Sequence, residues 1–387
     1  MRKSAVLACL VALAATASAD PATDPGHAMF TGQAGPAQLH VFPCHRCHGR
    51  DGRGGVEGAV PDIAALAVRY DPVSLRRALA GGTAADGRAL SRLMPRYAVT
   101  KAETEALLGY LLDVPRRERR GVLPATVRFA VMTDRDPDYP ALLRAAVLAQ
   151  VPQGRLHGRT IEFVRFDNLT SAEAGALALV GPPSGVSVSQ AAALGLPILF
   201  PRLWLTGAED ASLVRGLTAT RQDVAAAIAA DLRAQGLTGF APSAGLDGNL
   251  LDDLRLELGP HTDPRVRVLT GLVAPAALPA DTPAIAYLLP QAMAQAMAWQ
   301  AAGWQVRLVL DAPGLVDKMR VQGMTPSEAH ATMSATLLVG ALRAAGRDLT
   351  RRNMMDAFAR VDLSGLSLDY AAIPLTGTAE VAILPLD

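Results

Sequence analysis

The 387 residues of this chain show two different patterns of apolar and polar positions. Up to about residue 114, apolar residues fall on one side of helical segments such as Gly26–Phe30 and the stretch that carries Leu107, Leu108 and Leu111. The second of these segments begins at Thr100–Glu103, which has the spacing of a capping box. The first part of the chain is therefore predicted to contain helices.

Beyond residue 124, short apolar strands alternate with amphipathic helices. The predicted strands are Val127–Met132, Ile161–Phe166, Ala176–Val180, Ile198–Phe200, Val266–Leu269, Ala284–Leu288 and Val306–Leu310. The predicted helices between them include Tyr139–Gln150, Arg221–Gln235 and Gln291–Ala302. Such alternation indicates parallel sheets with helices on both faces.

The N-terminus has the pattern of a secretory signal peptide. A basic start at Met1–Lys3 precedes the apolar run Ala5–Ala15, and Ala17–Ala19 has the small-x-small form of a cleavage site. The apolar run is too short to remain as a stable membrane anchor. We therefore predict cleavage after Ala19 and export to the periplasm, which also removes Cys9.

The charged run Val114–Gly121, bounded by Pro115 and a glycine, separates the two patterns and is typical of a linker. The predicted organisation is a signal peptide at residues 1–19, a domain at 25–114, a linker at 115–124 and a domain at 125–387. The net formal charge is only +1, so the composition gives no basis for nucleic-acid binding.

The segment Cys44-His45-Arg46-Cys47-His48 carries the most specific chemistry in the chain. Cys-x-x-Cys-His is the sequence by which a c-type haem is attached through two thioether bonds. A zinc site would need a second pair of ligands, and a thioredoxin-type pair would need a strand–helix context. We therefore predict one covalent haem c on Cys44 and Cys47, with His48 as an iron ligand.

From Gly26 to about Val114 the chain resembles class I cytochrome c domains, which are all-α. Besides the haem motif, the resemblance rests on the first helix, on Pro61 and on the Met94-Pro95 pair before the last helix. It implies that the Pro61 carbonyl accepts a hydrogen bond from His48 and that Met94 is the sixth iron ligand. His/Met ligation is typical of single-electron transfer.

The rest of the chain resembles type I periplasmic solute-binding proteins, in the branched-chain amino acid and amide branch of ABC uptake systems. The resemblance rests on residues 127–132, 156–167, 179–184, 195–201, 290–303 and 341–350. It implies an α/β periplasmic-binding-protein-like I domain with two lobes and a ligand cleft between them.

Within that cleft, Ser184 matches the position of a ligand-contacting serine. Arg202 and Trp204 replace the small residues and the threonine of the family, and Asp311 is a loose candidate for the acid that pairs with a ligand ammonium group. The loop Leu288–Pro290 lacks the usual aromatic contact. These four residues, Ser184, Arg202, Trp204 and Asp311, form the predicted ligand site.

No Ser-His-Asp, metal-carboxylate or nucleotide-loop pattern is present in the sequence, and His157, His261 and His330 are predicted to be surface or capping residues. We therefore predict an electron carrier more readily than a catalyst. The main hypothesis is a periplasmic mono-haem cytochrome that exchanges single electrons with a partner such as a quinoprotein dehydrogenase. The alternative is an ABC-transporter substrate-binding protein for a small-molecule ligand, with a regulatory or sensory haem.

Overall fold

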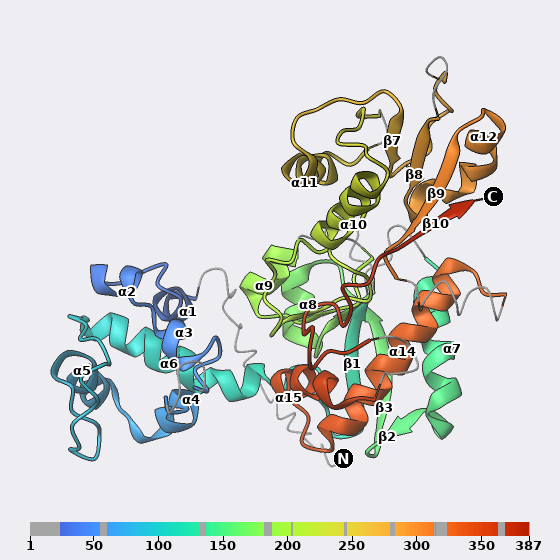
Figure 1. Cartoon of the computed structure of the whole chain (residues 1–387). Helices are drawn as coiled ribbons and strands as arrows, with labels where there is room; N and C mark the ends of the chain where they lie inside the picture. The colour runs from blue at the N-terminus through green and yellow to red at the C-terminus, as the bar shows by residue number, and fades with distance from the viewer. Residues whose placement is uncertain are drawn as a thin grey trace, which may run out of the picture. The chain divides into compact units, whose positions relative to one another are not determined.

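The computed structural model describes residues 24–54, 60–131, 137–181, 188–202, 204–243, 246–278, 283–312, 314, 323–362 and 368–386. The chain divides into two compact units, Met1–Pro115 and Arg116–Asp387 (Figure 1). The predicted signal peptide and Ser184 lie outside the described residues. In the parts of the chain that are described, no helix is long and apolar enough to cross a membrane.

The described part of the first unit consists of helices joined by turns and loops. The helices are α1 (Pro25–Phe30), α2 (Ala37–Val41), α3 (Cys44–His48), α4 (Ile63–Leu66), α5 (Pro72–Gly81) and α6 (Lys101–Arg117), with a 3₁₀ turn at Ala67–Arg69. Local sequence sets their starts. Asp24 caps α1, and Asp71 with Ser74 forms a capping box before Pro72. The predicted capping box of α6 is confirmed, because the Thr100 N–H donates to Glu103 Oε2 (2.7 Å) and the Glu103 N–H donates to Thr100 Oγ1 (3.2 Å).

The core of the first unit lies between its first and last helices. Phe30 of α1 and Tyr110 of α6 are buried, with ring centroids 5.3 Å apart. Gly26 permits this approach, because a Cβ atom there would lie 2.2 Å from the Ala106 carbonyl oxygen. A side chain at position 26 would therefore force α1 away from α6.

The second unit contains two sheets. Its strands are β1 (Thr126–Val131), β2 (Arg155–Leu156), β3 (Arg159–Arg165), β4 (Leu179–Val180), β5 (Ile198–Leu199), β6 (Val214–Arg215), β7 (Val266–Leu269), β8 (Ile285–Leu288), β9 (Gln305–Leu310) and β10 (Ala382–Leu386). The six-stranded sheet has the order β2-β3-β1-β4-β5-β6, and the four-stranded sheet has the order β10-β9-β8-β7. Apart from the antiparallel pairs β2–β3 and β9–β10, neighbouring strands are parallel. The unit is thus a mixed α/β fold with mainly parallel sheets.

Helices accompany both sheets. They are α7 (Tyr139–Gln150), α8 (Leu169–Gly175), α9 (Val188–Leu194), α10 (Arg221–Ala234), α11 (Gly248–Leu258), α12 (Ala296–Ala301), α14 (Pro326–Ala345) and α15 (Arg351–Ala357), with 3₁₀ turns at Pro152–Gly154, Pro290–Gln295 and Phe358–Arg360. The bounds predicted for α7 and β7 agree with the structure. The helix predicted at Gln291–Ala302 is divided between a 3₁₀ segment and α12.

We call the six-stranded sheet with α7, α8, α9, α14 and α15 the first lobe, and the four-stranded sheet with α10, α11 and α12 the second lobe. Figure 1 shows that the chain passes between the lobes three times. The three crossings join β6 to α10, β9 to α14, and the segment after α15 to β10. Neither lobe is therefore made from one continuous stretch of the chain.

The segment predicted as a linker is bound to the second unit. Helix α6 continues through Pro115 to Arg117. Arg120 then forms an ion pair with Glu173, the Glu118 carbonyl oxygen accepts a hydrogen bond from the Arg351 N–H (2.8 Å), and the Arg128 N–H donates to the Gly121 carbonyl oxygen (2.8 Å). These residues extend the packing of the first lobe.

Candidate ligand-binding site

The carboxyl ends of the parallel strands mark where a ligand site is expected. Strands β1, β4, β5 and β6 are parallel, so their carboxyl ends share one edge of the sheet. The first crossing leaves β6 at this edge, and the second leaves β9 at the carboxyl edge of the other sheet. Both carboxyl edges therefore border the crossings, and open α/β sheets bind ligands at such edges.

The structure brings together two of the predicted cleft residues, Trp204 and Asp311. Trp204 belongs to the loop between β5 and β6, and Asp311 follows β9. The indole Nε1–H of Trp204 donates to Asp311 Oδ2 (2.7 Å), and the half-buried ring packs against the core of the second lobe. These two residues therefore contact each other across the lobes.

Asp311 is poorly placed to be the acid that pairs with a ligand ammonium group. Its side chain is buried, and burial raises the pKa of its carboxyl group, an effect that the hydrogen bond from Trp204 only partly offsets. One carboxyl oxygen already accepts the indole N–H. The predicted acid is thus used inside the protein.

Arg202 lies on the exposed side of the same loop. Its Nη1 donates to Ser327 Oγ (3.2 Å) in the first turn of α14, so a first-lobe helix orients the guanidinium group. A guanidinium group always carries a positive charge and can bind a carboxylate through two hydrogen bonds.

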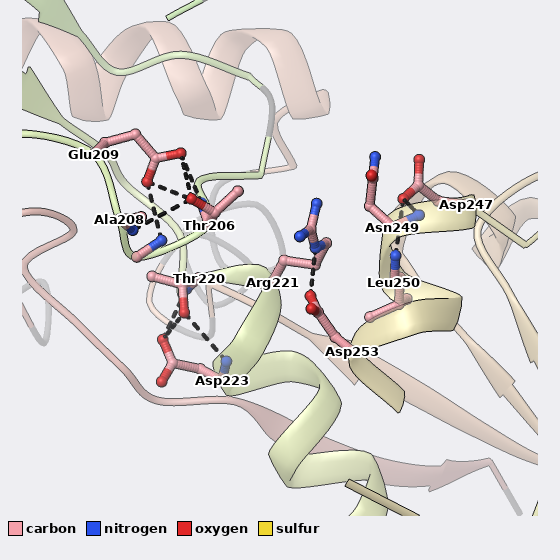
Figure 2. Close-up of polar contacts among 11 residues, drawn as sticks. Thr206, Ala208, Glu209, Thr220, Arg221, Asp223, Asp247, Asn249, Leu250 and Asp253 are labelled. Carbon is pink, nitrogen blue, oxygen red and sulfur yellow. Dashed lines mark hydrogen bonds and ion pairs between the residues drawn. The ribbon is translucent and has the colours of Figure 1, made fainter. Parts of the chain in front are cut away.

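After Trp204 the chain forms a compact turn at Thr206–Glu209, and Figure 2 shows the side chains of this turn. The Glu209 carboxylate accepts hydrogen bonds from the backbone N–H groups of Thr206 (2.9 Å) and Gly207 (3.0 Å), and from the Thr206 hydroxyl (2.9 Å). The Ala208 N–H donates to the Thr206 hydroxyl oxygen (3.3 Å). The carboxylate therefore holds the loop in a fixed shape beside the first crossing.

The first two helices of the second lobe are joined by an ion pair. Arg221, the first residue of α10, pairs through Nε with Asp253 of α11, and both side chains are mostly buried (Figure 2). The Arg221 N–H also donates to the Leu205 carbonyl oxygen (2.9 Å). The β5–β6 loop is thus bonded to the start of α10.

The sequence interpretation missed the roles of Glu209 and Arg221. Thr206–Glu209 has the Thr-x-x-acid spacing of a capping box, and this signal could have located the turn. Thr220–Asp223 has the same spacing at the start of α10, but it gives no sign of the ion pair between Arg221 and Asp253. His330 was also misjudged. It is buried rather than on the surface, and its Nδ1 lies 2.9 Å from the Tyr139 hydroxyl and 3.4 Å from Ser334 Oγ. His157 and His261 are exposed as predicted.

In the first unit, the residues of the Cys-x-x-Cys-His segment lie together on α3. The His48 Nδ1 is 3.2 Å from the Pro61 carbonyl oxygen, a hydrogen-bond distance. Burial lowers the pKa of His48 and raises the pKa of the Cys44 thiol to about 12. Met94 is half-buried and packs against the hydrophobic core to which Cys44 belongs.

A search of solved structures found chains that align with part of this protein. A fatty acid ABC transporter substrate-binding protein from Thermomonospora curvata is 16% identical and covers 69% of this chain and 90% of its own, with a TM-score of 0.48. A possible leucine/isoleucine/valine-binding protein from Rhodopirellula baltica SH 1 is 13% identical, and the alignment covers 69% of this chain and 98% of that protein, with a TM-score of 0.48. An ABC transporter substrate-binding protein from Desulfitobacterium hafniense in complex with Leu is 15% identical, and the alignment covers 61% of this chain and 88% of that protein, with a TM-score of 0.42. No protein-family model and no curated protein matches the chain.

These findings correct two predictions. The similar structures are substrate-binding proteins, and the described residues contain no group of three or more His, Cys, Asp or Glu side chains that could hold a metal ion. The prediction of a haem c cofactor and the main hypothesis of a haem electron carrier are therefore contradicted. The comparisons give no support for a quinoprotein partner.

Proposed function

We propose that this protein is a substrate-binding protein of the ABC-transporter type, which receives a small organic solute between the two lobes of its second unit. The observation that carries the proposal is the topology of that unit. Two mainly parallel sheets are joined by three crossings, and the carboxyl edges of both sheets border those crossings. The signal-peptide pattern at residues 1–19 supports a location in the periplasm.

The solute that fits best is a carboxylate without an ammonium group. Arg202 offers an exposed cation that α14 orients. Asp311, the candidate acid, is buried and already accepts the Trp204 N–H. Leu288, the last residue of β8, and Leu289, which follows it, are fully buried and apolar. Burying an unpaired ammonium ion costs several kcal/mol, enough to remove most of a micromolar affinity of about −8 kcal/mol.

Isothermal titration calorimetry tests this proposal with leucine and with 4-methylpentanoate, which has the same carbon skeleton without the ammonium group. We expect 4-methylpentanoate to bind with a dissociation constant at least tenfold below that of leucine. Arg202→Gln should weaken its binding at least tenfold. Arg255→Gln, which removes an exposed arginine of α11, is the matched control and should leave binding unchanged. Failure of both solutes to bind, or equal effects of the two variants, would contradict the proposal.

A further inference from the structure

We propose that Arg202, Trp204, Leu205 and Thr206, here called the strap, tie the two lobes of the second unit together at their crossings and limit how far the lobes separate, whether or not a solute is bound. The proposal concerns the hinge of this unit and does not depend on which solute it receives. It gives Trp204 a role as a positioning residue.

The strap has contacts in both lobes within a few residues. On the first-lobe side, Arg202 donates to Ser327 of α14, and Leu205 is buried with Leu213 and Val214. On the second-lobe side, the Trp204 ring packs against the core that contains Val224 and Val309. The Leu205 carbonyl oxygen accepts the Arg221 N–H (2.9 Å). The strap therefore connects two hydrophobic cores.

Asp311 joins the strap to two of the crossings. Its side chain accepts the Trp204 indole N–H (2.7 Å), and its carbonyl oxygen accepts the Ala219 N–H (2.8 Å) from the first crossing. Asp311 itself begins the second crossing. One residue thus holds the strap, the first crossing and the second crossing.

The third crossing is bonded to the first. The Gly216 N–H donates to the Leu375 carbonyl oxygen (2.7 Å), and the buried Tyr370 hydroxyl donates to the Gly216 carbonyl oxygen. Rotation of one lobe against the other therefore acts on a connected set of hydrogen bonds. Because the Trp204 ring is anchored in the second-lobe core, such a rotation must either withdraw the ring or carry the strap with it.

Hydrogen–deuterium exchange of the full chain, measured without solute, tests the strap. The relevant amides are those of Gly216, Ala219 and Arg221, whose N–H groups form the bonds described above. Trp204→Phe keeps an aromatic ring but removes the N–H donor. We expect their exchange to become at least tenfold faster in this variant, because amide exchange reports local opening.

Trp299→Phe is the matched control. Trp299 is buried in the second lobe, and its indole N–H donates to the Val273 carbonyl oxygen (3.1 Å), away from the crossings. It should leave exchange at the three amides unchanged. A second pair of variants separates the loss of the hydrogen bond from a general loss of folding. Asp311→Asn keeps an acceptor for the Trp204 N–H, so the three amides should exchange at nearly the wild-type rate. Asp311→Ala removes the acceptor and should accelerate their exchange. Wild-type rates in Trp204→Phe, or the same acceleration in Trp299→Phe, would overturn the proposal.

Discussion

Asp311 shows how one residue can have two physical consequences. Its buried carboxyl group joins Trp204 to the hinge, and the same burial favours the protonated form of the acid. A carboxyl group whose pKa is raised in the folded state binds a proton more tightly there than in the unfolded chain. Unfolding then releases that proton. The contribution of Asp311 protonation to the free energy of unfolding is therefore complete below the ordinary pKa of 3.8, and it is lost as the pH rises through the pKa of Asp311 in the folded protein.

Asp311→Asn tests this pH dependence, because it removes the ionisation but keeps a hydrogen-bond acceptor. The amide can still accept the Trp204 N–H but cannot ionise. We expect the stability of the wild type relative to this variant to fall between pH 4 and pH 7, by about 1.4 kcal/mol for each unit by which the pKa is raised. Urea unfolding at several pH values measures the difference. A constant difference across that range would show that burial does not perturb Asp311.

The second prediction concerns the two cysteines of α3. Burial raises the pKa of Cys44 to about 12, whereas Cys47 is only partly buried. Since the thiolate is the reactive form, iodoacetamide at pH 8 should modify Cys47 well before Cys44 in the folded protein, and both equally in guanidinium. Peptide mass spectrometry gives the two rates. Sulfur atoms that remain unreactive in guanidinium would show that they are already held in covalent bonds.

Part of the candidate site could be found from single residues, and part could not. Arg202 and Trp204 are candidates for the ligand site because they depart from the family pattern, and Asp311 is a candidate because it fits that pattern loosely. The sequence could not reveal that Trp204 and Asp311 bond to each other, since 107 positions separate them and the contact depends on how two lobes meet. His330 was misjudged for the same reason, because its partner Tyr139 lies 191 positions away.

At the scale of elements, periodicity located long or well-bounded segments such as α7 and β7. It missed β2 and β6, which have two residues each and include an arginine, Arg155 or Arg215, in place of a continuous apolar run. It also missed β10, an edge strand that contains Pro385 and pairs antiparallel with β9 after a return from the other lobe. Proline is tolerated at such an edge, but it argues against a strand when only the sequence is known.

The charged run after α6 shows a similar limit to what the sequence alone can predict. A series of arginines with proline and glycine is typical of a solvated linker. Here Glu173 is buried between two of the chain's arginines, Arg120 and Arg351, with side chains 2%, 9% and 5% exposed. The run of charges in the sequence indicates a polar segment. It does not reveal that Arg120 pairs with Glu173, which lies 53 positions away.

Two fragments, residues 116–387 and 122–387, test whether this segment contributes to the stability of the second unit. The longer fragment should unfold in one cooperative transition. The shorter one lacks Arg120 and Glu118, and a hydrogen bond to a charged group contributes about 1.5–3 kcal/mol, so it should be less stable by at least about 1.5 kcal/mol. Urea unfolding followed by circular dichroism measures this difference. Equal stability would mean that the segment is a simple linker, as the sequence indicated.

At the scale of the whole molecule, the α/β class of the second unit could be predicted because it follows from the order of strands and helices. The main functional hypothesis rested on a five-residue motif, Cys44–His48, whereas the larger part of the chain forms the α/β unit. A fold by itself does not define an activity. What the second unit adds is a specific arrangement of Arg202, Trp204 and Asp311 at the crossings, and this arrangement supports both proposals.

The three crossings also determine the order in which the protein can be completed during synthesis. The first-lobe core contains Leu337, Leu338 and Leu342 of α14, which the ribosome produces after the whole of α10, α11 and α12. The second lobe in turn gains β10 only when Ala382–Leu386 have been synthesised, after the whole of the first lobe. Both lobes therefore expose apolar surface until α14 and β10 have been synthesised, which makes the nascent chain dependent on protection from aggregation.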